Sequence, residues 1–337
     1  METAEIHITN AIIHILDSMV GMPVLSDTVL DPGADFDDFL KGHILKIMES
    51  DDKKNCSFQE ESSVYALLKD WDSERFVAAS QEIAKELYHI MNKNIAIPPA
   101  DLLVVEYVME QCPYLALLKM NYRSSYTHMT NSDPWGNNNG LVKQKAILPG
   151  EHQRLQEAAL IDLEHGSIKV LEKKYEVNGV KTNYFSSMFL KCQGSLSPKT
   201  KLAIVNRTVE DIQKKYYNES EQFEVRMETK SIMNQELEEN GCLDVPRVID
   251  RIFRGQDNMR EEAQEKLEKW NIAQKPVELE NPNTTKKYTK QHLMTDTGIE
   301  IKIPMEEYNN KEHIEFITNQ DGSISVLIKN VGSIVSK

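Results

Sequence analysis

The chain has 337 residues, of which 40% are apolar and 27% charged, and its formal net charge is −14. This length exceeds one typical core and predicts two or three domains. No run approaches the roughly 18 apolar residues of a membrane span, so no membrane segment is expected. The acidic total excludes a histone-like protein that coats DNA by bulk charge, although a local basic surface could still bind DNA.

The sequence carries no motif for a cofactor or a common catalytic mechanism. The four cysteines stand singly, without a CxxC pair or clustered histidines, which excludes a typical zinc site and a disulfide framework. Walker A, dinucleotide-binding, HExxH and GxSxG motifs are absent. The N-terminus is not a secretory signal. We therefore expect a cytoplasmic protein with reduced thiols, no cofactor and no enzymatic activity.

The first 205 residues predict an α+β domain with a mixed, largely antiparallel sheet. Strand-forming residues alternate or cluster in some segments, and others have helical periodicity. Strands are predicted at 5–16, 24–30, 101–110, 114–123, 142–148, 158–163 and 168–177, and helices at 34–50, 60–69 and 73–91.

Two features of this region have alternative interpretations. The segment 131–140, NSDPWGNNNG, predicts a loop, and Trp135 at its tip could stack on nucleic acid or fold back onto the domain. Three acids at a helix start, Asp35, Asp37 and Asp38, could ligate a metal, but they also complement the helix dipole, which we favour.

The stretch 167–205 is basic within an acidic chain, with seven lysines against two acidic residues. A turn at 177–180 precedes a short helix with Tyr184, Phe185, Met188 and Phe189, and Gly194 is placed to end it. Unpaired N–H groups at this helix start, beside Lys181, would attract phosphate. The alternative is a solvated strand with a core helix. The candidate DNA-binding residues are Lys169, Lys173, Lys174, Lys181, Lys191, Lys199 and Lys201.

The rest of the chain predicts two further parts. Residues 206–282 form an acidic helical module, suited to docking another protein, with a helix that begins at Asp244-Val245-Pro246. Residues 283–337 form a small β-rich unit after a linker at 281–285. A secondary basic cluster consists of Lys286, Lys287 and Lys290. The predicted domains are therefore 1–205, 206–282 and 283–337.

A family resemblance covers nearly the whole chain. The segment ILPGEHQRLQEAALIDL (147–163), a hairpin into IKVLEKKY and the aromatic helix NYFSSMFLKCQG resemble the bacterial nucleoid-associated protein family of the NdpA type. The strands NAIIHIL and CPYLALLKMNY and the C-terminal β unit occur in the same order. The resemblance implies a non-enzymatic nucleoid protein that binds double-stranded DNA.

Three functions stay open on the sequence alone. DNA binding through phosphate contacts, with little base preference, leads. The second is an adaptor that docks a protein through 206–282, and copies of the chain could form a homo-oligomer. The third is a metal-dependent nuclease using Asp296, Glu300 and Lys302. Replacing Lys173, Lys174 and Lys181 by Glu is expected to remove most DNA affinity, and replacing Lys286, Lys287 and Lys290 to matter less.

Overall fold

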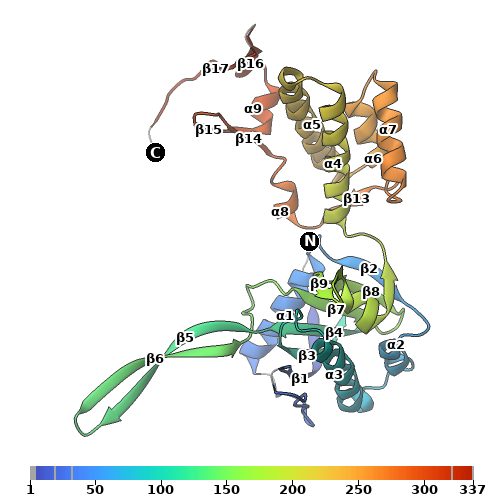
Figure 1. The fold of residues 1–337 in the computed structure, drawn as a ribbon, viewed down its shortest axis with the longest axis vertical. Helices are drawn as coiled ribbons and strands as arrows, with labels where there is room; N and C mark the ends of the chain where they lie inside the picture. Colours follow the sequence, from blue (N-terminus) through green and yellow to red (C-terminus); the bar gives the residue numbers. More distant parts are fainter. Residues whose placement is uncertain (1–4, 19, 32, 320–321, 336–337) are drawn as a thin grey trace. The chain divides into compact units, whose positions relative to one another are not determined.

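The computed structural model describes residues 5–18, 20–31, 33–319 and 322–335, without the side chains of Asp133 and Ser220. The chain divides into two compact units, Met1–Ser197 (unit 1) and Pro198–Lys337 (unit 2). Each unit is shown in Figure 1. Helices and an antiparallel sheet are both present, which confirms the predicted α+β class.

Unit 1 is built on a seven-stranded sheet, and every strand pairing in it is antiparallel. Most of the predicted strands are found there. The order across the sheet is β1 (Ile6–Leu16), β3 (Ala100–Met109), β4 (Cys112–Asn121), β7 (Glu157–Asp162), β8 (Ser167–Leu171), β2 (Lys54–Phe58) and β11 (Cys192–Gly194).

Helices cover both faces of this sheet. Helix α1 (Ala34–Met48) packs Leu40 and Ile44 on one face, and helices α2 (Ser63–Leu68) and α3 (Phe76–Lys93) pack on the other. The turn Ser73–Arg75 precedes α3. Because β3 and β4 are buried on both faces, their sequences are nearly continuous apolar runs.

Two predicted elements of unit 1 outside the basic stretch are wrong. The expected strand at 24–30 is reduced to one bridge between Val24 and Ile15. Pairing does not continue because the Ser26 backbone N–H donates to the His14 ring and its hydroxyl donates to the Ile13 carbonyl. The expected loop at 131–140 lies within a long hairpin, β5 (Arg123–Asp133) and β6 (Gly136–Ile147), and only Pro134 and Trp135 form its turn.

The basic stretch is folded differently from the prediction. Strand β8 ends at Leu171, and β9 (Tyr175–Val177) pairs instead with β10 (Val180–Thr182). The aromatic helix is present as a π-helix, Phe185–Leu190, but it ends at Lys191, whose φ is +46°. Gly194 does not end it, since this residue lies on β11 opposite Cys56.

Unit 2 is a four-helix core followed by hairpins. Helices α4 (Pro198–Tyr216), α5 (Glu219–Asn240), α6 (Val245–Ile252) and α7 (Asp257–Glu268) share one apolar core. Asn218 starts α5 with a capping box, Gly241 ends it at φ +68°, and Asp244 caps α6 as predicted. Helix α4 runs through residue 205 without a break, so the predicted domain boundary falls inside it.

The C-terminal part of unit 2 consists of short elements. Strand β12 (Cys242–Leu243) pairs with β13 (Val277–Glu278), and the segment expected as a linker forms helix α8 (Pro282–Thr285). Two hairpins flank helix α9 (Met305–Asn309). They are β14 (Lys290–Met294) with β15 (Glu300–Pro304), and β16 (Ile314–Thr318) with β17 (Ile324–Ile328).

Candidate nucleic-acid interface

Five of the candidate lysines belong to unit 1. Lys169 lies half-buried on β8, Lys173 and Lys174 are exposed between β8 and β9, and Lys181 is exposed on β10. Lys181 stands opposite Glu176 in the β9–β10 register, which offsets its charge. Lys191 donates to the Glu61 carbonyl at 3.4 Å. Two of these five lysines, Lys181 and Lys191, therefore have other groups of the chain beside them.

The start of the π-helix already holds a carboxylate. Glu172, whose side chain is 1% exposed, accepts hydrogen bonds from the backbone N–H of Ser186 at 2.9 Å and from its hydroxyl at 2.8 Å. Lys54 Nζ lies 2.7 Å from the same carboxylate. Because the chain's own anion occupies this position, these Ser186 donors are not available to the phosphate expected at the helix start.

The last two candidate lysines of the basic stretch, Lys199 and Lys201, lie in the first turns of α4 and so belong to unit 2. Lys199 is close enough to Lys287 to lower the pKa of Lys287, after burial, which is the larger cause. Burial and, secondarily, Lys287 lower the pKa of Lys230 on α5. Lys199 and Lys230 therefore each lie within electrostatic range of Lys287, and these three residues, which come from separate segments, are here called the lysine cluster.

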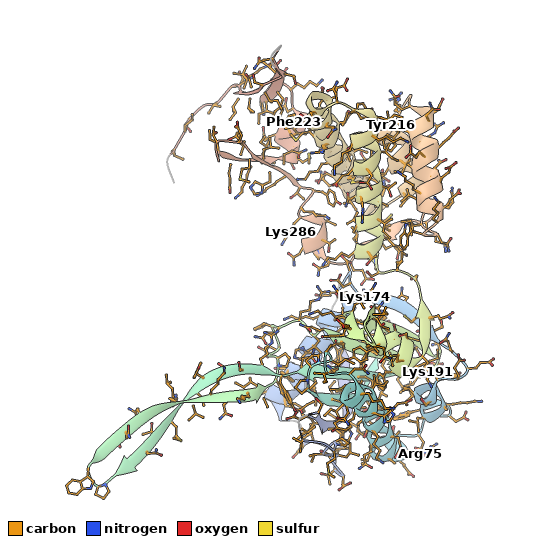
Figure 2. All side chains as sticks on the ribbon, viewed as in Figure 1. Arg75, Lys174, Lys191, Tyr216, Phe223 and Lys286 are labelled. Atoms are coloured by element: carbon orange, nitrogen blue, oxygen red, sulfur yellow. The ribbon has the colours of Figure 1, made fainter. Side chains whose placement is uncertain are left out.

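Neighbouring side chains support the lysine cluster. The Lys287 ammonium lies 4.9 Å from the ring centroid of buried Tyr288, whose hydroxyl accepts a hydrogen bond from Asn206 at 2.8 Å. Among the described residues, neither Lys230 nor Lys287 has an ion pair with a carboxylate. Lys286, labelled in Figure 2, donates to Asn283 at 2.9 Å, and Lys290 is exposed on β14.

The sequence missed Lys230. It lies in the stretch EVRMETKSIM, where Arg226 is the one other basic residue and where the acidic helical module had been expected to meet protein. Only the packing of α5 beside the segment after α8 brings Lys230 to Lys287. A sequence count of local charge cannot detect a cluster that tertiary structure assembles.

Two of the three residues of the nuclease hypothesis form an ion pair on a hairpin, and Asp296 lies in the turn between its strands. Glu300 lies 3.4 Å from Lys302 and 3.5 Å from His292, across the β14–β15 pair. Within the described ranges, no three His, Cys, Asp or Glu side chains are grouped so that they could hold a metal ion. At the start of α1, Asp37 pairs with Lys41 at 2.6 Å.

A buried ionisable pair lies in unit 1. Lys119 and Glu157 are both fully buried with Nζ and Oε2 3.7 Å apart, and burial lowers the pKa of Lys119 to about 8. An amine with this pKa could act as a base, but Lys119 is closed to solvent and also donates to the Pro98 carbonyl at 3.2 Å. The pair therefore offers no access to a substrate.

The comparisons with known proteins bear on the identity of the chain. The family described as nucleoid-associated protein YejK (NA37) matches residues 12–334. The chain belongs to this family. The predicted resemblance is thereby confirmed over nearly the whole length. A search of curated proteins found no match. No helix in the described part of the chain has the length and apolar character to cross a membrane.

Proposed function

We propose that this chain is a non-enzymatic protein of the bacterial nucleoid that binds double-stranded DNA, chiefly through phosphate contacts and with little sequence preference. Membership of a nucleoid-associated family supports the location. The observation that carries DNA binding is the lysine cluster, Lys199, Lys230 and Lys287.

The closeness of Lys230 and Lys287 is costly without an anion. Lys287 opposes the charging of Lys230, and partial burial together with this repulsion lowers the pKa of Lys230. A phosphate backbone placed there would offset the repulsion and release counterions, which is the main source of non-specific DNA affinity. Unit 2 has 21 basic and 25 acidic residues, so this concentration of positive charge is local.

Charge reversal tests the role of the cluster. Lys230→Glu with Lys287→Glu should weaken duplex binding about tenfold or more, measured by fluorescence anisotropy at fixed salt. The matched control is Lys266→Glu with Lys269→Glu at the end of α7, where Lys266 already pairs with Glu262 at 2.9 Å. It carries the same charge change and should bind nearly as the wild type. Equal loss in both variants would show that only net charge matters.

Protein docking is a second candidate, favoured by a groove in unit 2. The ring centroid of Phe223 on α5 lies 5.6 Å from that of Phe316 on β16. The ring centroid of Tyr308 on α9 lies 6.0 Å from that of Phe316. These rings line a cavity of about 370 Å³. Aromatic residues at the centre of a surface groove are typical anchors for a partner. A Phe223→Ala variant that keeps DNA affinity but loses a partner would assign the groove to docking.

A further inference from the structure

The β5–β6 hairpin forms a two-stranded sheet of its own, separate from the seven-stranded sheet of unit 1. In Figure 1 it extends away from the seven-stranded sheet, to which it is not hydrogen-bonded. Its strands hold 11 and 12 residues, a reach of roughly 35 Å at about 3.4 Å per residue. A two-stranded hairpin without a core is marginal in water, which suggests that a partner completes it.

The surface of this arm is polar and basic. Nearly all side chains of β6 are exposed, and cross-strand hydrogen bonds join Thr130 to Asn139 and Ser132 to Asn137, each at 2.8 Å. Residues 123–147 hold three basic residues and one acidic residue, within a unit of 18 basic and 28 acidic residues. Amide and hydroxyl groups with a net positive charge suit the edges of bases and the phosphates beside them.

A large apolar side chain, that of Trp135, lies exposed at the end of the arm. Trp135 is 95% exposed in the two-residue turn between Asp133 and Gly136, next to Pro134, whose ring fixes φ. Exposed apolar side chains are otherwise sparse on the arm, with Tyr126, Met129 and Leu141 as the large ones. Proteins that enter the minor groove insert such wedges between base steps and bend the duplex.

We propose that the β5–β6 arm lies along the minor groove of duplex DNA and that Trp135 enters a base step and bends the helix. This inference rests on the proposed DNA binding. It identifies the arm as the part of the protein that bends the bound duplex. The arm matches about one helical turn of duplex, ~34 Å. A second copy of the chain fits the arm less well, because subunit interfaces are more apolar than this Ser-, Thr- and Asn-rich surface.

The first test measures DNA bending by energy transfer between dyes at the two ends of a short duplex, with the full chain. The wild type should raise the transfer efficiency. Trp135→Ala should bind about tenfold more weakly, as expected for a lost aromatic–base stack, and should lose the increase at saturation. Trp270→Ala is the matched control, because Trp270 is also exposed, at 55%, but lies in unit 2. Full bending by Trp135→Ala would overturn the inference.

The second test shortens the arm at a register pair. Tyr126 and Lys143 are opposite each other, so residues 127–142 can be replaced by Asn-Gly, which favours a two-residue hairpin turn. This variant should keep the wild-type melting temperature, because the arm buries no core, and should lose bending and at least tenfold in affinity. Netropsin, which occupies the minor groove, should displace the wild type.

The possible outcomes distinguish a failure of the proposal for the arm from a failure of the proposed DNA binding. Wild type that binds no DNA overturns both proposals. Wild type that binds, together with a shortened variant that binds and bends equally, overturns the arm alone. Wild-type binding that resists netropsin overturns the minor-groove placement. A shortened variant that keeps DNA affinity and bending but loses a dimer in analytical ultracentrifugation would assign the arm to a second copy and overturn the inference.

Discussion

His14 is fully buried on β1, and both of its ring nitrogens have partners. Nδ1 accepts from the Ser26 backbone N–H at 3.2 Å, and Nε2 lies 3.0 Å from the Ser80 hydroxyl on α3. Burial lowers the pKa of His14 to about 4, against an ordinary value of 6.5. The neutral ring is therefore part of the native packing, and a proton on it favours unfolding.

Acid should destabilise unit 1 through this histidine. The unfolded chain takes up the proton below pH 6.5 and the folded chain only near pH 4, so stability is full above pH 6.5 and falls as pH drops toward 4. The loss is on the order of 3 kcal/mol. Urea unfolding at pH 7 and pH 4 should show a smaller loss for His14→Gln. An equal loss in both proteins would contradict the assignment.

Gly194 is required by close packing. A Cβ atom at this position would lie 2.4 Å from both the Asn55 carbonyl oxygen and the Cys56 sulfur. Gly194→Ala should therefore lower the free energy of unfolding by about 1–3 kcal/mol. Gly140→Ala is the control, because nothing lies within 4 Å of its Cβ, and it should stay within about 0.5 kcal/mol of the wild type. A neutral Gly194→Ala would show that β2 and β11 can separate.

At the scale of elements, strands with buried faces could be predicted from the sequence, and strands without a core could not. Strands β3 and β4 were predictable because both faces are buried and their sequences are apolar throughout. The β5–β6 arm was not, since neither face meets a core and Asn and Gly otherwise indicate a loop. The helix end at Lys191 was missed because a non-glycine residue takes positive φ there, whereas Gly194 is kept for packing.

Charge reversal at the lysines in and before the β9–β10 hairpin should affect DNA affinity differently from charge reversal in the lysine cluster. Replacing Lys173, Lys174 and Lys181 by Glu should weaken binding less than reversing Lys230 and Lys287, because Lys181 stands opposite Glu176, which offsets its charge. The sequence alone instead ranked this triple variant above replacement of Lys286, Lys287 and Lys290, a group that shares Lys287 with the lysine cluster. Anisotropy titrations at one salt concentration compare them. If only the Lys173, Lys174 and Lys181 variant lost binding, the DNA interface would lie at the β9–β10 hairpin and not at the lysine cluster.

At the scale of the molecule, the two units should separate at the segment before α4. The residues 195–197 have no regular secondary structure, and α4 begins at Pro198. Limited proteolysis should therefore cut near 193–198 and leave a stable fragment of unit 1. Cuts at 205–210, expected from the sequence alone, are disfavoured because these residues are helical. Preferred cleavage there would contradict the two-unit organisation.

Family membership was predictable at this scale because the order of elements is spread over nearly the whole sequence. The candidate interface was only partly predictable. Lys199 and Lys287 were named from local charge, but in separate groups, and their union with Lys230 depends on how α4, α5 and the segment after α8 pack. An acidic chain can therefore present a basic surface that no sequence window contains.

The salt dependence of duplex binding tests the central claim most directly. Each neutralised phosphate contributes a slope of about −0.9 to the plot of log affinity against log salt concentration. With roughly three to five contacts, the wild type should give a slope of about −3 to −4.5, and Lys230→Glu with Lys287→Glu should make it shallower by about 2. The DNA should remain intact with magnesium present. Absence of binding, or a slope near zero, would contradict the account.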